Sequence, residues 1–205
     1  ASSPELLEQG KGDIWDSGKI ESDASQWITY QGKTLKCNAS YYWKVKIDTN
    51  KGATNWSAPA FWTTGLFNEA DWQGQWIGLD RAAPGDSETQ WSRLAARYLR
   101  KEFAVKKSVK RATVHIAGMG LYELFINGQR IGNQVLAPAP TDYRKTILYN
   151  TYDVTSLLQT ENAIGVTLGN GRFYTMRQNY KPYKIPTFGY PKLRLNLIVE
   201  YADGS

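Results

Sequence analysis

Apolar and polar residues alternate along much of this chain with a period of two residues. In the clearest example, YYWKVKI at 41–47, Tyr41, Trp43, Val45 and Ile47 occupy alternate positions. Successive side chains of a β-strand point to opposite faces, so this pattern predicts a strand with one half-buried face. Stretches with the 3.6-residue period of an amphipathic helix are almost absent. We therefore expect an all-β fold.

A second series of strand patterns begins at Arg97. Its strongest local signal is Asn127-Gly128, because both residues tolerate the positive φ angles of a type I′ hairpin turn. Expected strands cover 97–105, 112–116, 121–126, 129–132 and 163–168, with a break at Gly118 and Gly120, a short helical turn over 153–158 capped by Asp153 or Thr155, and a last strand with Leu193, Leu195, Leu197 and Val199 inward. Short strands separated by turn residues predict a β-sandwich.

The first 64 residues resemble part of a fibronectin type III domain. Leu35 precedes Tyr41 by six residues, and the motif WSAP at 56–59 precedes a last strand at 61–64. In such domains the tyrosine hydroxyl reaches back to the backbone as a tyrosine corner. A complete domain needs about seven strands and ~100 residues, so we expect the first two strands to be missing from this stretch. We expect a half-sandwich that is propped against the second domain or completed by a neighbouring chain.

These patterns define three segments: a partial fibronectin-like domain at 1–64, a junction at 65–96 and a second sandwich at 97–205. In the junction we expect Trp72 and Trp76 to pack the two domains together rather than to stack on sugars. ASSPELL at the start lacks an initiator Met and a leader pattern, and the last strand ends in a turn at Asp203-Gly204. We expect both ends to be boundaries within a longer protein.

Composition excludes several classes of site. The chain has one Cys and one His, so an intramolecular disulfide, a Cys-rich zinc site and a multi-histidine metal site are ruled out. The net charge of +6 arises beyond residue 64. Its densest cluster, KKSVKR at 106–111, is expected in a solvated loop rather than in a nucleic-acid interface.

No apolar run reaches the ~18–20 residues of a membrane span. Scarce cysteine does not fix the compartment, and we favour an extracytoplasmic location over a cytoplasmic one.

Longer motifs resemble the N-terminal region of bacterial α-L-rhamnosidases, glycoside hydrolase family 78. They are WDSGKIES at 15–22, WSAPAFWTTGL at 56–66, RYLRKEF at 97–103, GLYELFINGQRIGNQVLAPAPTDYRKTILYNTYDVTSLL at 120–158 and ENAIGVTLGNGRFY at 161–174. Any single piece is weak evidence, because the NG hairpin and the DVT-x-LL turn recur in many galactose-binding-like sandwiches, but the ordered combination is specific. The resemblance implies a partial fibronectin-like sandwich followed by a jelly-roll or galactose-binding-like sandwich.

The resemblance also implies a parent enzyme that cleaves terminal rhamnose from glycosides in a downstream (α/α)6 barrel. Glycoside hydrolysis needs two carboxyl groups ~5–10 Å apart, and the acids of the second half are scattered. We expect Glu102 and Glu123 to face solvent and Asp153 to cap a turn, and only Asp142 lies in an aromatic loop. The chain is therefore predicted to be a non-catalytic fragment. The alternative is a stand-alone adhesion or lectin-like module.

Some modules of this family are assigned calcium-dependent rhamnose binding, as carbohydrate-binding module family 67. A sugar site needs hydrogen-bonding groups beside an aromatic platform. The candidate residues are Asp142 and Tyr143 in TDYR, Asn170, Arg172 and Tyr174 in GNGRFY, and a platform from Tyr180, Tyr183, Phe188 and Tyr190. The alternative is a purely structural role, in which Asp142 caps a turn, Asn170 adopts a left-handed conformation in a turn and the aromatic residues cover the end of the sandwich.

We expect no resident cofactor, with calcium kept as an alternative, because neither stretch has an adjacent Asp-Asn pair to supply oxygen ligands. The expected partners are a rhamnose-containing glycan and the remainder of the parent enzyme. A dimer through exposed strand edges is a further expectation.

Overall fold

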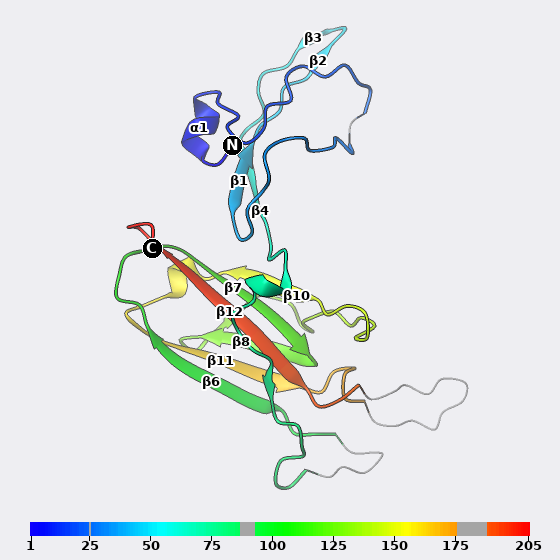
Figure 1. The fold of residues 1–205 in the computed structure, drawn as a ribbon, viewed down its shortest axis with the longest axis vertical. Coiled ribbons are helices and arrows are strands. Elements are labelled where there is room, and N and C mark those ends of the chain that lie inside the picture. Colours follow the sequence, from blue (N-terminus) through cyan, green and yellow to red (C-terminus); the bar gives the residue numbers. More distant parts are fainter. Residues whose placement is uncertain (25, 87–92, 176–187) are drawn as a thin grey trace, which may run out of the picture. The chain divides into compact units, whose positions relative to one another are not determined.

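A computed structural model of the chain describes residues 1–24, 26–86, 93–175 and 188–205. It divides into two compact units, residues 1–72 and 73–205, which are described separately (Figure 1). The boundary falls within the 65–96 stretch that the sequence patterns set between the two domains. Nearly all regular structure is antiparallel β, so the predicted all-β fold class is confirmed.

The first unit is built around two short antiparallel ribbons. Its elements are helix α1 (Pro4–Glu8), strands β1 (Ser40–Trp43), β2 (Asp48–Thr49), β3 (Gly52–Ala53) and β4 (Ala60–Thr63), and the 3-10 helix η1 (Glu69–Asp71). Strand β1 pairs with β4, and β2 pairs with β3. Helix α1 begins where the sequence supplies a cap, because the Ser3 hydroxyl accepts a hydrogen bond from the Leu6 N–H and Pro4 follows it.

The tyrosine corner predicted in this unit is present. Tyr41 is buried, and its hydroxyl accepts a 2.7 Å hydrogen bond from the Lys36 backbone N–H. Thr64 closes the same corner by donating to the Lys36 carbonyl oxygen and accepting from the Ala39 N–H. These contacts fasten the loop before β1 to the strand that follows it.

The half-buried strand expected over 41–47 is only partly formed. Strand β1 ends at Trp43, and beyond it the Val45 and Ile47 carbonyls accept hydrogen bonds from Ser57 and Thr54 outside any assigned ladder. Of the alternating face only Tyr41 is buried, whereas Trp43, Val45 and Ile47 are 49%, 45% and 54% exposed. Among the described residues of this unit no second sheet packs on that face, so the burial that the alternating pattern predicts is found only at Tyr41.

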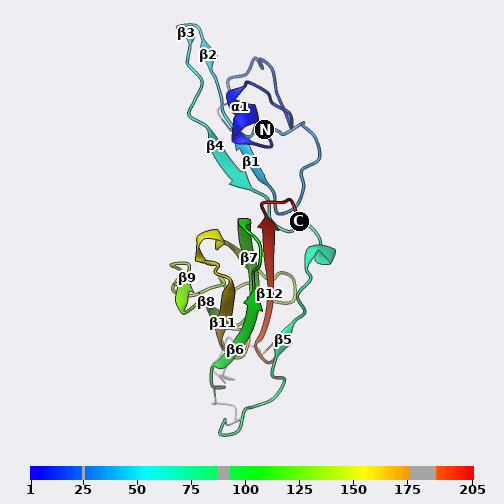
Figure 2. The same ribbon diagram turned by 90° about the vertical axis from the view of Figure 1, so that its left-hand side faces the viewer.

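The second unit is a sandwich of two four-stranded antiparallel sheets (Figures 1 and 2). One sheet has the order β10-β7-β12-β5 and the other the order β6-β11-β8-β9. The elements are β5 (Ile77–Gly78), β6 (Arg97–Ala104), β7 (Val109–Met119), β8 (Leu121–Ile126), β9 (Gln129–Ile131), β10 (Tyr149–Asp153), the 3-10 helix η2 (Thr155–Leu157), β11 (Glu161–Gly169) and β12 (Lys192–Tyr201).

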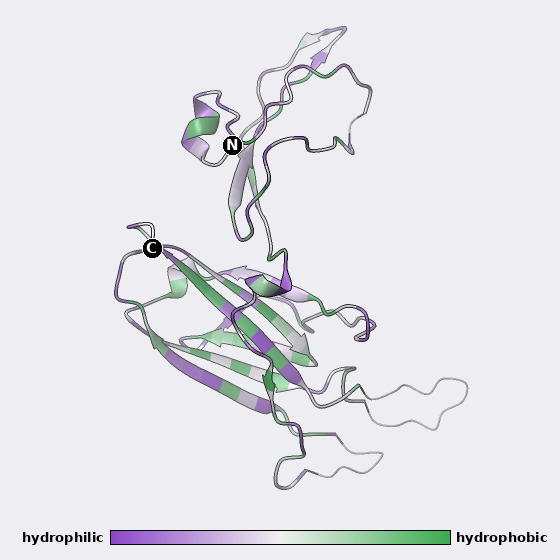
Figure 3. Ribbon diagram, in the orientation of Figure 1, coloured by the Kyte–Doolittle hydropathy of each residue, from purple (hydrophilic) through white to green (hydrophobic). Residues whose placement is uncertain are grey.

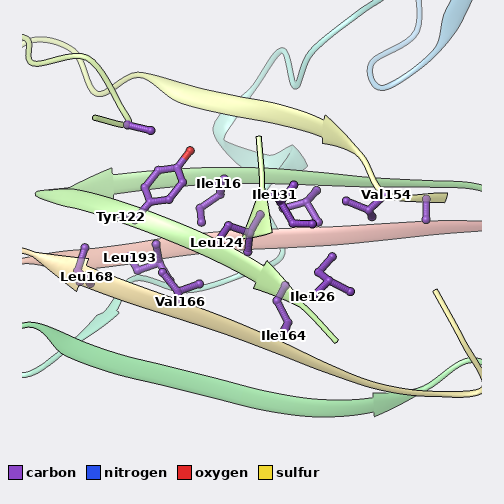
Figure 4. Packing of buried hydrophobic residues seen from close by; sticks show 13 residues of the cluster. Ile116, Tyr122, Leu124, Ile126, Ile131, Val154, Ile164, Val166, Leu168 and Leu193 are labelled. Carbon is purple, nitrogen blue, oxygen red and sulfur yellow. The ribbon is translucent and has the colours of Figure 1, made fainter. Parts of the chain in front are cut away.

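The core of this unit lies between the two sheets, and apolar side chains alternate along the strands that enclose it (Figures 3 and 4). The enclosing residues include Val114, Ile116, Leu124, Ile126, Val166, Leu168 and Leu193. Leu195, Leu197 and Val199 pack against this cluster, so the predicted inner face of the last strand is confirmed. Burying such side chains stabilises the fold by roughly 1.5–3 kcal/mol each.

The hairpin predicted at Asn127-Gly128 joins β8 to β9, with φ angles of 51° and 81° at the two turn residues. The expected break at Gly118 and Gly120 is only half right. Strand β7 continues through Gly118, whereas Gly120 has a φ of 136° and a Cβ there would lie 2.3 Å from the Gly169 carbonyl oxygen. Only Gly120 therefore needs to be glycine for backbone reasons.

The short helical turn is shorter than expected, covering Thr155–Leu157 with Val154 at its N-cap. Asp153 lies one residue earlier and accepts hydrogen bonds from the backbone and hydroxyl of Thr155. Thr155 in turn accepts one from the Ala112 N–H in β7. The two predicted capping residues therefore tie the turn to the sheet instead of capping the helix.

Residues after the unit boundary lie along the edge of β12 that faces away from β7. Strand β5 pairs with Lys192 and Leu193, and the Arg194 guanidinium donates to the Gly74 carbonyl oxygen at 2.7 Å. A Cβ on Gly74 would lie 2.2 Å from the Leu195 carbonyl oxygen. Part of the stretch assigned to the junction is thus an integral strand of the second sandwich, while packing of the units by Trp72 and Trp76 stays a prediction.

Candidate functional site

The two stretches proposed for sugar contact meet at one end of the second unit. The ring of Tyr143 lies edge-on to Phe173 and Phe188, with centroid distances of 5.3 Å to each. Phe173 and Phe188 stack with a centroid distance of 6.0 Å. TDYR and GNGRFY are therefore neighbours in space, as a shared site requires. Phe173 is buried, so this cluster is a packed core of the loops rather than an open platform.

Asp142 is occupied by its own turn. Both of its carboxylate oxygens accept from the Arg144 guanidinium, at 2.9 Å and 3.2 Å, and one also accepts from the Arg144 N–H. The Arg144 hydrogen bonds lower the pKa of Asp142 below its ordinary value. The residue is an ionised, internally paired carboxylate that closes a turn.

Asn170 fastens its loop to a distant part of the unit. Its side-chain amide donates a 2.8 Å hydrogen bond to the Leu94 carbonyl oxygen, and its backbone carbonyl accepts one from the Tyr174 N–H. The left-handed residue of this turn is Gly171, with a φ of 51°, and not Asn170 as the structural alternative supposed. Asn170 is thus a loop anchor whose amide nitrogen already has a partner.

Arg172 and Tyr174 are the most accessible members of the set. Arg172 is exposed, and its charge opposes the rise that burial causes in the pKa of Tyr143. Tyr174 is half-buried and stacks on Tyr190, with centroids 5.8 Å apart. Tyr180 and Tyr183, proposed for the platform, lie outside the described residues.

Six other carboxylates of the second unit are also paired with cations. The pairs are Asp80–Lys192, Asp86–Arg97, Glu102–Arg100, Glu123–Arg130, Glu200–Arg111 and Asp203–Lys107. Hydrogen bonds from Lys107 and Ser205 lower the pKa of Asp203 to about 2, and backbone hydrogen bonds from Ala95 and Ala83 lower that of Asp86. Glu102 and Glu123 are exposed as predicted.

The donor set at the loop cluster does not fit calcium. Calcium takes six or more oxygen ligands, yet both oxygens of Asp142 face Arg144. Across residues 1–24, 26–86, 93–175 and 188–205, no group of three or more His, Cys, Asp or Glu side chains is placed to hold a metal. In that same part of the chain, no helix is long and apolar enough to cross a membrane.

Two features were missed by the sequence patterns. His115 in β7 is fully buried, with its Nδ1 2.9 Å from the Thr151 hydroxyl and its ring edge-on to Tyr149. Asn196 in β12, at a position that alternation assigns to solvent, is buried and bound to the backbone of residues 73 and 74. The lone histidine in a strand pattern was the one available signal for this buried polar layer.

The first unit contains an apolar hollow. It is an open groove of about 500 Å³, with mostly apolar walls that include Ile14, Trp15, Ile28, Trp43, Val45 and Trp62. Three of these side chains, Ile28, Trp43 and Val45, are about half exposed. An apolar groove of this size on a small unit indicates a contact surface.

Comparison with known families and proteins gives a consistent result. A family model described as the α-L-rhamnosidase N-terminal domain matches residues 107–205, and one described as a Rha78A-like N-terminal immunoglobulin domain matches residues 3–68. An α-L-rhamnosidase of Formosa agariphila is 36% identical over 225 aligned residues, which cover 100% of this chain and 24% of that protein.

Solved structures agree with the sequence relatives. The α-L-rhamnosidase structure from Dictyoglumus thermophilum has a TM-score of 0.86 and 40% identity, covering 100% of this chain and 23% of that one. The native enzyme structure from Aspergillus terreus has a TM-score of 0.81 and 34% identity, covering 91% of this chain and 21% of that one. The chain thus spans about a quarter of the length of the relatives it matches.

Proposed function

Because this chain belongs to the α-L-rhamnosidase family and matches the N-terminal region of its members, we propose that it is a non-catalytic structural part of an enzyme that releases terminal rhamnose from glycosides. Its parent would carry the catalytic groups in the remaining three quarters of the polypeptide. Two family models that together match residues 3–68 and 107–205 support the N-terminal assignment. The partner of this region is then the remainder of the parent enzyme.

The observation that carries a non-catalytic role is the state of the acids in the second unit. Glycoside hydrolysis needs a carboxylic acid with a raised pKa beside a second carboxylate. Here Asp86, Asp142 and Asp203 have lowered pKa values, and the acids paired with lysine or arginine face cations rather than each other. A carboxylate held ionised in this way cannot donate a proton to a leaving group at neutral pH.

An activity assay tests this role. The purified chain is incubated with p-nitrophenyl rhamnoside, and the full-length parent protein serves as the positive control. We expect the chain to release no nitrophenol above a blank while the parent does. Turnover by the chain alone would contradict the proposal, and an Asp142→Asn variant would then show whether the one acid in an aromatic loop is responsible.

We assign the first unit to the fibronectin type III kind of immunoglobulin-like domain. The bond from the Lys36 N–H to the Tyr41 hydroxyl supports this assignment, since a tyrosine corner is typical of such sandwiches. Its role in this proposal is to extend the enzyme's N-terminal scaffold. The groove beside Trp43 is the surface through which it would contact further polypeptide.

A second role, contact with a rhamnose-containing glycan, is favoured by one observation. The exposed Arg172 directly precedes Phe173, whose ring contacts Tyr143, and Tyr174 stacks on Tyr190, so one loop carries a charged hydrogen-bond donor and aromatic rings. Asp142 and Asn170 would act indirectly, by holding the two loops. Calcium would not be needed, because Asp142 already faces Arg144.

Calorimetric titration with rhamnose, with and without calcium, tests that second role. We expect weak binding that is unchanged by calcium and is lost in Arg172→Ala and Tyr174→Ala. Lys101→Ala, an exposed cation on strand β6, is the matched control and should bind as the original chain does. No heat and no thermal shift at millimolar sugar would leave only the scaffolding role.

A stand-alone adhesion or lectin-like module is the alternative, and the two readings differ in how far the parent reading frame continues. Hundreds of further residues are expected for the enzyme and few for the module.

Pairing of two copies through exposed strand edges is a further proposal. Light scattering should show a dimer, and a strict monomer in dilute solution would remove that proposal.

A further inference from the structure

The second unit contains two Asn-Gly sequences, Asn127-Gly128 and Asn170-Gly171. Glycine has no Cβ, so its backbone nitrogen can approach the side chain of the asparagine before it without hindrance. Attack of that nitrogen on the side-chain amide carbon is the first step of deamidation. Both sequences have the same covalent chemistry, and any difference in their reactivity therefore comes from the fold.

Asn127 is held at both polar atoms of its side chain. The amide nitrogen donates to the Leu157 carbonyl oxygen and to the Asn162 side-chain oxygen, both at 3.0 Å. The side-chain oxygen accepts from the Ala163 N–H at 2.9 Å. Attack by Gly128 would require this side chain to rotate and to break all three hydrogen bonds. The fold therefore protects Asn127, although the residue is exposed.

Asn170 is held by a single side-chain hydrogen bond. Its amide nitrogen donates to the Leu94 carbonyl oxygen at 2.8 Å, and its side-chain oxygen has no partner among the described residues. The Gly171 N–H, which carries the attacking nitrogen, has no hydrogen-bond partner in that part of the chain either. The next residue, Arg172, is exposed, so solvent reaches the loop. Opening of one hydrogen bond is enough to free both reacting groups.

We propose that Asn170 is a site of spontaneous deamidation, which proceeds there much faster than at Asn127 in the same molecule. Hydroxide takes the proton of the Gly171 nitrogen, and this nitrogen bonds to the Asn170 side-chain carbon, closing a succinimide ring and releasing ammonia. Water then opens the ring at one of its two carbonyl groups. The products are aspartate and isoaspartate at position 170, and no cofactor or oxidant takes part.

Either product releases the loop that Asn170 anchors. A carboxylate accepts hydrogen bonds but donates none, so the bond to the Leu94 carbonyl is lost and a negative charge faces that oxygen. Isoaspartate also routes the main chain through an additional methylene, which displaces the carbonyl that accepts from the Tyr174 N–H. Phe173 and Tyr174 lie in the released segment, so the aromatic packing of this loop loosens with it.

The modification itself does not depend on the proposed function, because it needs neither a glycan nor hydrolysis. Its consequence bears on the candidate glycan contact, since Arg172 and Tyr174 belong to the released segment and glycan affinity would fall as the protein ages. Failure of the glycan role leaves the modification standing. Absence of the modification leaves the family assignment and the non-catalytic role untouched.

Mass spectrometry of the folded chain, incubated at mildly alkaline pH, tests the difference between the two sites. Trypsin separates them, because residues 112–130 and 146–172 form two peptides that each contain one Asn-Gly sequence. Fragmentation of the peptides assigns the added mass to a single residue. We expect Asn170 to react at least about tenfold faster than Asn127, because Asn127 must break two further hydrogen bonds. In urea, where the fold is lost, the two sites should react at similar rates.

Two substitutions complete the test. Asn170→Gln keeps an amide on a longer side chain that closes its ring far more slowly, so peptide 146–172 should stay unmodified. Asn170→Asp supplies one product directly and should increase hydrogen exchange at the Tyr174 amide by at least about tenfold. Asn133→Asp makes the same change of charge at an exposed position and is the matched control. Equal reaction of the two sites in the folded chain would overturn the proposal, and so would faster reaction of Asn127.

Discussion

Asn196 and Gly74 are separated by 122 residues, yet the Asn196 side-chain oxygen accepts a 2.8 Å hydrogen bond from the Gly74 N–H. The same oxygen accepts from the Gln73 N–H at 3.1 Å. These two bonds, with that from Arg194 to the Gly74 carbonyl, attach the first residues of the second unit to its central strand β12. A buried amide with two backbone donors is strongly constrained.

We expect Asn196→Ala to destabilise the second unit by about 2 kcal/mol, because two partly buried backbone N–H groups lose their acceptor. Urea unfolding followed by circular dichroism measures the change. Asn133→Ala, at an exposed loop position, is the control and should shift stability by less than about 0.5 kcal/mol. Equal effects of the two substitutions would show that the Asn196 bonds contribute nothing specific.

Tyr41→Phe should destabilise the first unit by about 1–3 kcal/mol, because the Lys36 N–H is left without the hydroxyl that accepts its hydrogen bond. The ring itself, which packs on Trp62 at a centroid distance of 5.2 Å, is retained. Thermal unfolding monitored by tryptophan fluorescence reports the loss. Tyr42→Phe removes a hydroxyl from the neighbouring position and should change the melting temperature little.

The parts of the fold that the sequence predicted are those decided by local geometry. Asn127-Gly128 forms the hairpin because both residues accept positive φ, and Tyr41 forms its corner across five residues. The inward face of β12 follows from simple alternation. Exposure along 43–47 does not follow from alternation, which predicts burial there, but it agrees with the half-sandwich expected from the missing strands of this unit.

The candidate site shows the same division. Residue types in TDYR and GNGRFY suggested a shared site, and the structure brings the two stretches together through Tyr143 and Phe173. Their partners could not be anticipated, because Leu94 is 76 residues from Asn170 and its carbonyl carries no sequence signal. Buried polar contacts such as that of Asn196 likewise depend on which segment happens to cover an outward position.

Asn127 should be the least replaceable residue of the β8–β9 turn. Its side chain donates to the Leu157 carbonyl and to Asn162 and accepts from the Ala163 N–H. We expect Asn127→Ala to cost about 2–3 kcal/mol in chemical denaturation, combining the lost bonds with left-handed strain. Asn127→Gly should cost about 1 kcal/mol less, since glycine loses the same side-chain bonds but adopts the left-handed conformation without strain. If the two variants unfold alike, the φ angle is not the constraint.

His115 should make the stability of the second unit depend on pH near neutrality. Its pKa is lowered, first by burial and then by the nearby positive charge of Arg111, so the folded protein holds the ring neutral below the pH at which the unfolded chain protonates, ordinarily near 6.5. A folded pKa below the unfolded one means that stability is complete above about pH 6.5 and falls as pH decreases toward the folded pKa.

Melting temperatures measured between pH 8 and pH 5 should therefore decline through this window in the original chain. The chain has a single histidine, so His115→Gln, which keeps a polar group near the Thr151 hydroxyl, should flatten the profile while lowering stability at pH 8. Carboxylates titrate at lower pH and do not account for a loss between pH 6.5 and 5.5. An unchanged slope in the glutamine variant would contradict this assignment of the pH dependence to His115.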